Sequence, residues 1–150
     1  MATTSILGTA LDNLRTQLVA RAGLSGVRVE TGQLGELEEA EVISLSRATV
    51  DHEAFAMGGI RRETITITGF IDVARPGQIT GTANASAKAA RDRALAIVAE
   101  IEDQLEDDDT LSGVVKDARF GGYEYTDSAT DTGHHAHVEF TIQAEEHLIR

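Results

Sequence analysis

The chain has 150 residues with a net charge of −12, and its length suits a single domain over 1–150. It contains no cysteine, which excludes disulfides, cysteine-ligated zinc and iron–sulfur clusters. The excess of acidic residues argues against a protein that grips nucleic-acid phosphates. No segment approaches the ~20 apolar residues that span a bilayer, and the N-terminus does not resemble a signal peptide. We therefore expect a protein that is made and kept in the cytoplasm and has no membrane partner.

Two elements are predicted before the first long loop. Residues 5–22 place Leu7, Leu11, Leu14 and Leu18 on one stripe, which predicts an amphipathic helix. A short strand follows over 27–31, and residues 32–39 are glycine- and glutamate-rich, which indicates a loop.

The middle of the chain predicts two strands. Residues 41–50 alternate, but neither face is clearly polar, so one face is expected to meet the helices and the other a neighbouring subunit. Residues 51–59 indicate a loop. Residues 60–73 give the clearest strand pattern, in which Gly69 suggests a bulge or a bend, and a turn follows at 75–78.

The second half predicts one more helix and two more strands. An alanine-rich helix is expected over 82–107, then a turn at 110–113 and a strand over 114–125 interrupted at Gly121 and Gly122. A polar loop is expected over 126–133 and a last alternating strand over 134–145. The order α-β-β-β-α-β-β predicts an α+β fold, with an antiparallel or mixed sheet of about five strands and two helices on one face.

One group of residues could bind a metal ion. His135, His137 and Glu139 alternate along a strand and therefore share a face. Side chains spaced along a flat strand diverge, however, so a polar row facing solvent or a subunit is the favoured interpretation.

The other polar motifs do not point to an enzyme. The acidic run at 100–109 lacks the ligand spacing of an EF-hand, and the glycine pairs match no nucleotide-binding loop. We therefore predict no enzyme, no catalytic residue, no cofactor and no metal.

Contacts between subunits are predicted at four apolar residues. Phe55 and Met57 lie in the expected loop, where they would either fold back on the core or dock a partner. Ile43 and Leu45 lie on one face of the strand at 41–50.

Six segments in this order resemble the tail terminator (tail completion) proteins of long-tailed bacteriophages. They are ALDNLRTQL at 10–18, GVRVETG at 26–32, RRETITITGFIDV at 61–73, AARDRALAIVAEIEDQL at 89–105, DDTLSGVV at 108–115 and HVEFTIQAEE at 137–146. The most recognisable piece is D-x-L-x-G, here Asp109, Leu111 and Gly113.

The resemblance implies a virion structural protein at the head-proximal end of the tail, as in siphophages, assembled in the host cytoplasm. Such proteins form a hexameric ring that caps the tail tube, stops its polymerisation and joins it to the head connector. DNA passes through the lumen without specific binding, and the acidic charge of this chain is compatible with such a conduit. The acidic segments 36–41 and 100–109 are both candidates to face that lumen. The alternatives are another head–tail joining protein, such as a stopper or connector, or a small non-viral binding adaptor.

Overall fold

The computed structural model describes residues 5–32, 40–54, 60–76, 84–130 and 133–149. Two α-helices, α1 (Leu7–Ala20) and α2 (Asn84–Asp107), accompany five strands. The strands are β1 (Arg28–Thr31), β2 (Glu41–Ala54), β3 (Ile60–Pro76), β4 (Asp117–Thr130) and β5 (Gly133–Ile149), and a short 3₁₀ helix, η1 (Ala22–Leu24), follows α1.

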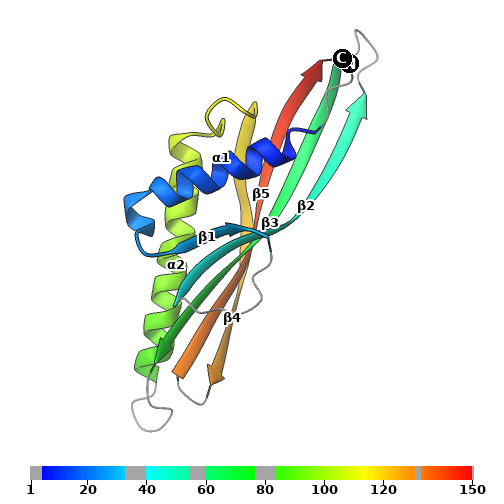
Figure 1. Ribbon diagram of the computed structural model, residues 1–150. Helices are drawn as coiled ribbons and strands as arrows, with labels where there is room; N and C mark the ends of the chain where they lie inside the picture. Colours follow the sequence, from blue (N-terminus) through cyan, green and yellow to red (C-terminus); the bar gives the residue numbers. More distant parts are fainter. Residues whose placement is uncertain (1–4, 33–39, 55–59, 77–83, 131–132, 150) are drawn as a thin grey trace.

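The strands form one mixed sheet in the order β1-β2-β3-β5-β4. The pair β1–β2 is parallel, and β2–β3, β3–β5 and β5–β4 are antiparallel. Figure 1 shows that the sheet is strongly twisted and that β2, β3 and β5 extend past the helices at one end. The predicted α+β class and the element order are confirmed.

A hydrophobic core lies between the helices and one face of the sheet. The leucine stripe of α1 and the alanine–isoleucine stripe of α2 both face this core. The sheet contributes residues that are register partners of one another, such as Ile43, Ile71 and Val138. The core contains no Trp and uses Phe140 as its largest fully buried side chain. Small and branched aliphatic residues therefore provide most of the burial energy.

Four strands, β2, β3, β4 and β5, run further toward the C-terminus than the sequence predicts, and β3 includes Arg75 and Pro76 of the predicted turn. Residues 51–54 continue β2, and residues 126–130 continue β4, where the polar sequence indicated a loop. Asp127, Ser128 and Ala129 are exposed because β4 is an edge strand, although Asp127 lies across a shallow cleft from Lys88 and Arg91 of α2. An edge segment that is exposed on both faces has no apolar alternation to detect.

The sheet has two irregularities. The interruption predicted at Gly121 and Gly122 is confirmed, because the β4–β5 register shifts between Phe120 and Gly122. The bulge predicted at Gly69 is not in β3. It lies across from Gly69 in β2, where the register shifts between Leu45 and Arg47.

Neither α1 nor α2, the two α-helices of the described residues, is long and apolar enough to cross a membrane.

Candidate functional site

The face of the sheet that points away from both helices is polar. Its central row consists of Thr64, Thr66 and Thr68 of β3, whose register partners on β5 are Glu145, Gln143 and Thr141. The strand registers place more carboxylates than guanidinium groups on this uncovered face. The acidic residues are Glu30, Asp51, Glu53, Asp72, Asp117, Glu124, Glu139 and Glu145, and the arginines are Arg28, Arg47, Arg62 and Arg119. The uncovered face is therefore acidic and rich in hydroxyl groups.

Both edges of the sheet present strand backbone along which no described strand lies. On one edge, β1 pairs only with Val42–Leu45, so no described strand pairs with the outer side of β2 from Arg47 to Ala54. On the other edge, β4 pairs only with β5 among the described strands. An unpaired strand edge of this length can pair with another chain.

Histidines and an aspartate meet at one end of the uncovered face. Asp72 Oδ1 lies 3.0 Å from His135 Nε2 and 2.7 Å from His137 Nδ1. The ring of Phe70 stacks on His137, with ring centroids 5.4 Å apart. The two histidines therefore share one carboxylate, which neighbours them on the adjacent strand.

The predicted metal triad does not assemble. Glu139 lies on the same face as the histidines, but its carboxylate pairs with Arg47 Nη2 at 3.3 Å. The residues that the structure describes include no group of three or more His, Asp or Glu side chains arranged to hold a metal ion.

The four predicted interface residues divide into two pairs. Ile43 is 0% exposed and Leu45 is 2% exposed, and both belong to the hydrophobic core beneath the helices. They therefore offer no surface to a second subunit. Phe55 and Met57 lie outside the described residues, so their predicted role stays a prediction.

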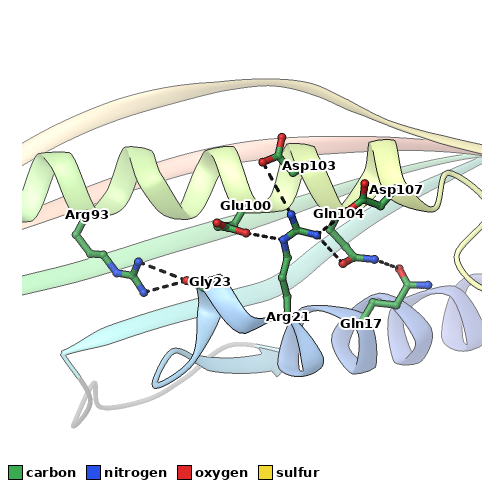
Figure 2. A network of polar contacts seen from close by, with 8 residues as sticks. All are labelled: Gln17, Arg21, Gly23, Arg93, Glu100, Asp103, Gln104 and Asp107. Atoms are coloured by element: carbon green, nitrogen blue, oxygen red, sulfur yellow. Dashed lines mark hydrogen bonds and ion pairs between the residues drawn. The ribbon is translucent and has the colours of Figure 1, made fainter.

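The acidic run at 100–109 is largely used within the chain. Figure 2 shows Arg21, just after α1, pointing at one face of α2. Its guanidinium lies 2.5 Å from Glu100, 3.1 Å from Gln104 and 3.0 Å from Asp107. Hydrogen bonds to Glu100 and Asp107 raise the pKa of Arg21, so its guanidinium stays protonated. Several carboxylates of this run therefore dock the helices together.

Three other acidic residues of the run at 100–109 lie beside β4. Leu105 and Phe120 form the apolar part of a cleft of about 430 Å³ between these two elements. Glu102, Glu106 and Asp109 line the same cleft. The Glu102, Glu106 and Asp109 carboxylates come from α2 and the turn after it, and the cleft extends to Asp117 and Arg119 of the edge strand β4.

The D-x-L-x-G segment is a structural turn. Leu111 is fully buried in the core, and Leu111, Ser112 and Gly113 all have positive φ, at 49°, 62° and 83°. The turn is held by Asp108, which accepts hydrogen bonds from the backbone N–H groups of Thr110 at 3.0 Å and Ser112 at 2.8 Å. A hydrogen bond from the Thr110 hydroxyl at 2.7 Å, together with those from the two N–H groups, lowers the pKa of Asp108. The motif therefore sets the backbone path of the turn between α2 and β4.

A buried carboxylate ties the start of α1 to the sheet. Glu63 of β3 is 0% exposed, and it accepts hydrogen bonds from Ser5 Oγ at 2.8 Å and the Ile6 backbone N–H at 3.1 Å. Its other oxygen lies 2.6 Å from His52 Nε2. Sequence inspection missed this residue, because Glu63 stands beside two arginines in a strand pattern and its partners are far away in the chain.

No protein-family model matches the chain, and no curated protein matches it in sequence. Among solved structures, the chain is similar to one chain of a structure titled "Virion of native gene transfer agent (GTA) particle". The TM-score is 0.54, the sequence identity is 13%, and the match covers 95% of this chain and 98% of that chain. The two chains share a fold. The shared region includes nearly all of both molecules, so no large extra domain separates them.

Proposed function

We propose that the protein is a virion structural protein, and specifically a tail terminator that forms a ring on the end of the tail tube. The observation that carries this proposal is the fold shared with a chain of a virion particle over almost the whole length of both chains. The element order that resembles tail terminators supports the finer assignment. The ring, hexameric as in that family, stops tube polymerisation and binds the tail tube protein on one side and the head connector or stopper on the other.

The sheet provides what a ring needs. A cyclic ring is built from one heterologous interface, in which two different surfaces of each subunit are complementary. The outer edge of β2 and the outer edge of β4 are different surfaces on opposite sides of the subunit. Each can therefore meet the other kind of edge on a neighbouring copy.

The uncovered face supports a DNA conduit. DNA moves through a lumen without being retained only if the wall does not bind its phosphates. Carboxylates outnumber arginines on this face, and its centre is a row of threonines. This chemistry makes the uncovered face a better lumen wall than the acidic run at 100–109, which lies on the helix side of the sheet.

The mass of the particle in solution tests the proposal. Light scattering across protein concentration, with and without magnesium, is expected to give a six-fold mass, and negative-stain images are expected to show rings. The rings should not elongate on their own, which separates a terminator from a tube protein. A chain that neither self-associates nor binds tail tubes under any salt or cation condition would contradict the proposal.

The predicted docking loop can be tested in the same assay. Phe55→Asp is expected to impair assembly while the free energy of unfolding of the monomer stays nearly unchanged, because charge in an apolar interface is costly. A large loss of monomer stability would instead assign Phe55 to the core.

A further inference from the structure

The cleft between α2 and β4 has an apolar lining. It opens where α2 ends and β4 begins, at the same end of the molecule (Figure 1). Leu105 and Ala118 are 3% and 2% exposed, and Phe120 packs against the same core. The volume of about 430 Å³ lies within the range of ligand pockets, roughly 300–1,000 Å³. The cleft is therefore large enough to admit a long side chain.

The apolar lining continues onto an exposed aromatic side chain. Tyr123 lies on the helix side of β4, as Phe120 does, because its register partner Phe140 belongs to the core. The ring centroids of Tyr123 and Phe120 are 6.4 Å apart, and Tyr123 is 49% exposed. Tyrosine is enriched where proteins bind one another, since its ring gives a large contact area. This extension of the cleft suits a protein segment better than a small ion.

The cleft also carries carboxylates that lack a cation. Glu102, Glu106 and Asp109 line it from α2 and the turn after it, and Asp117 lines it from β4. In the described part of the chain, no basic side chain forms an ion pair with any of these four residues. Arg119 is the basic residue in the same lining, so negative charge remains in excess. The carboxylates of α2 that face α1, in contrast, share Arg21.

The end of α2 adds to this negative charge. The carbonyl groups at a helix C-terminus carry a partial negative charge, which basic residues in the last turn offset. The last turn of α2 contains no basic residue, and Glu106 lies in it. The described chain therefore leaves the negative potential of the cleft without compensation, and a cation from another molecule would supply it.

Two other occupants fit the cleft less well. The described side chains include no group arranged to hold a metal ion, and an apolar lining provides no oxygen ligands for one. A second copy of this chain has few cations to offer, because most of its arginines already pair with its own carboxylates. The cation is therefore expected from a different protein.

We propose that the cleft between α2 and β4 binds a basic segment of the tail tube protein. An arginine or lysine of that segment lies with its methylene stem on Leu105 and Phe120 and with its charged end among the carboxylates. An apolar neighbour of that cation packs on Tyr123. This inference rests on the proposed function for the identity of the partner, since a terminator acts by binding the end of the tube. It adds the surface and the chemistry of that contact.

The cleft uses only the start of β4. Residues 117–120 line it, so the outer edge of the strand from Gly122 onward stays open to a neighbouring copy. A subunit can therefore hold the basic segment and take its place in the ring at the same time.

Binding of defined peptides tests the chemistry of the cleft. A fluorescein-labelled peptide, GRVRLRG, is expected to bind the full-length protein in anisotropy titrations, and GEVELEG is expected not to bind. GRGRGRG keeps the three positive charges but loses the apolar side chains, and is expected to bind at least about fivefold more weakly. Equal binding of GRVRLRG and GRGRGRG overturns the proposal, because the attraction then reflects only the overall charge of the chain.

Charge reversal tests the location. Glu102→Lys/Glu106→Lys is expected to weaken binding of GRVRLRG by about tenfold or more. The matched control, Asp12→Lys/Glu99→Lys, makes the same change in net charge at exposed residues outside the cleft. It is expected to weaken binding by no more than about threefold, because distant charges are screened by salt. Equal losses in the two double variants overturn the proposal.

Hydrogen exchange gives a readout that needs no variant. GRVRLRG is expected to slow amide exchange of the wild-type protein over residues 102–120. Unchanged exchange over these residues in the presence of saturating peptide overturns the proposal. Thermal unfolding of each variant separates lost binding from lost folding.

Tail tubes test the identity of the partner. Glu102→Lys/Glu106→Lys is expected to form rings at the same concentration as the wild type and to bind isolated tail tubes at least about tenfold more weakly. The control Asp12→Lys/Glu99→Lys is expected to bind tubes to within about threefold of the wild type. Tubes that bind the cleft variant as tightly as the wild type overturn the proposal, including the case in which the variant instead loses binding to the head connector.

The outcomes for the two proposals differ. If wild-type rings cap tail tubes and the cleft variant caps them equally well, the cleft inference is wrong and the terminator proposal stands. If the peptide binds in the cleft but the protein neither forms rings nor binds tubes, the terminator proposal is wrong, and so is the tube as the source of the basic segment.

Discussion

Gly69 of β3 lies directly opposite Phe140 of β5, and the ring of Phe140 fills the space that a side chain at Gly69 would need. A Cβ atom at position 69 would lie 2.4 Å from Cζ of Phe140. Phe140 is fully buried and stacks on Phe120, with centroids 5.9 Å apart, so the ring has little room to move. Gly69→Ala is therefore expected to lower the free energy of unfolding by about 1–3 kcal/mol in urea titrations.

A second glycine provides the control. Gly8 lies in the first turn of α1, and a Cβ there would have no neighbour within 4 Å. Gly8→Ala is expected to raise stability by up to about 1 kcal/mol, because alanine favours the helix. If Gly69→Ala were as harmless as Gly8→Ala, the close contact with Phe140 would not be what requires a glycine.

The turn after α2 offers a comparison between two adjacent aspartates. Asp108 accepts hydrogen bonds from backbone N–H groups, whereas Asp109 is exposed. Asp108→Ala is expected to cost about 1–2 kcal/mol, as the loss of a helix-end cap does. Asp109→Ala is expected to stay within about 0.5 kcal/mol of the wild type. The reverse order in chemical denaturation would contradict the assignment of Asp108 as the residue that holds the turn.

Much of the fold could be predicted because its signals are local. The alternation over 60–73 and 134–145 and the apolar stripes of both helices depend only on neighbouring residues. The ends of β2 and β4 depend on pairing with β3 and β5, which are distant in the chain. Their polar residues therefore looked like loops.

The candidate site was harder to predict, because its residues take partners from other strands. His135, His137 and Glu139 share a face as expected, but Asp72 pairs with the histidines and Arg47 with the glutamate. The face of β2 that the helices cover could not be chosen from residues 41–50, where neither face is clearly polar. Ile43 and Leu45 proved to be on the covered face.

The charge of Arg21 is expected to hold α1 and η1 against α2. Arg21→Met keeps most of the side-chain stem but removes the hydrogen bonds to Glu100, Gln104 and Asp107, and leaves the two carboxylates to repel each other. We expect a loss of about 1–3 kcal/mol in the free energy of unfolding. The loss should shrink as salt is added, because salt screens the repulsion.

An exposed arginine is the matched control for Arg21. Arg91 pairs with the adjacent Asp92 on the surface of α2. Arg91→Met is expected to change stability by no more than about 0.5 kcal/mol. Equal losses for the two variants would mean that the Arg21 network adds nothing beyond a surface charge.

Glu63 is expected to make stability depend on acid pH. Burial alone would raise the pKa of this carboxyl, but hydrogen bonds from Ser5, His52 and the Ile6 backbone lower it below its ordinary value. The unfolded chain therefore binds this proton more readily than the folded chain. The contribution is complete above the unfolded pKa and is lost as the pH falls through the folded pKa.

Glu63→Gln tests this pH dependence, because glutamine keeps the shape and removes the charge. We expect the variant to be less stable than the wild type by about 1–3 kcal/mol at neutral pH, and the difference to shrink as the pH falls toward 3. Glu41 and Asp108 also have lowered pKa values and give both proteins a common acid-sensitive background. Only the difference between the two unfolding curves therefore reports on Glu63. Glu106→Gln, which changes an exposed residue of α2, is expected to follow the wild type at every pH. A Glu63→Gln difference that stayed constant from neutral pH to pH 3 would mean that Glu63 acts through packing and not through its charge.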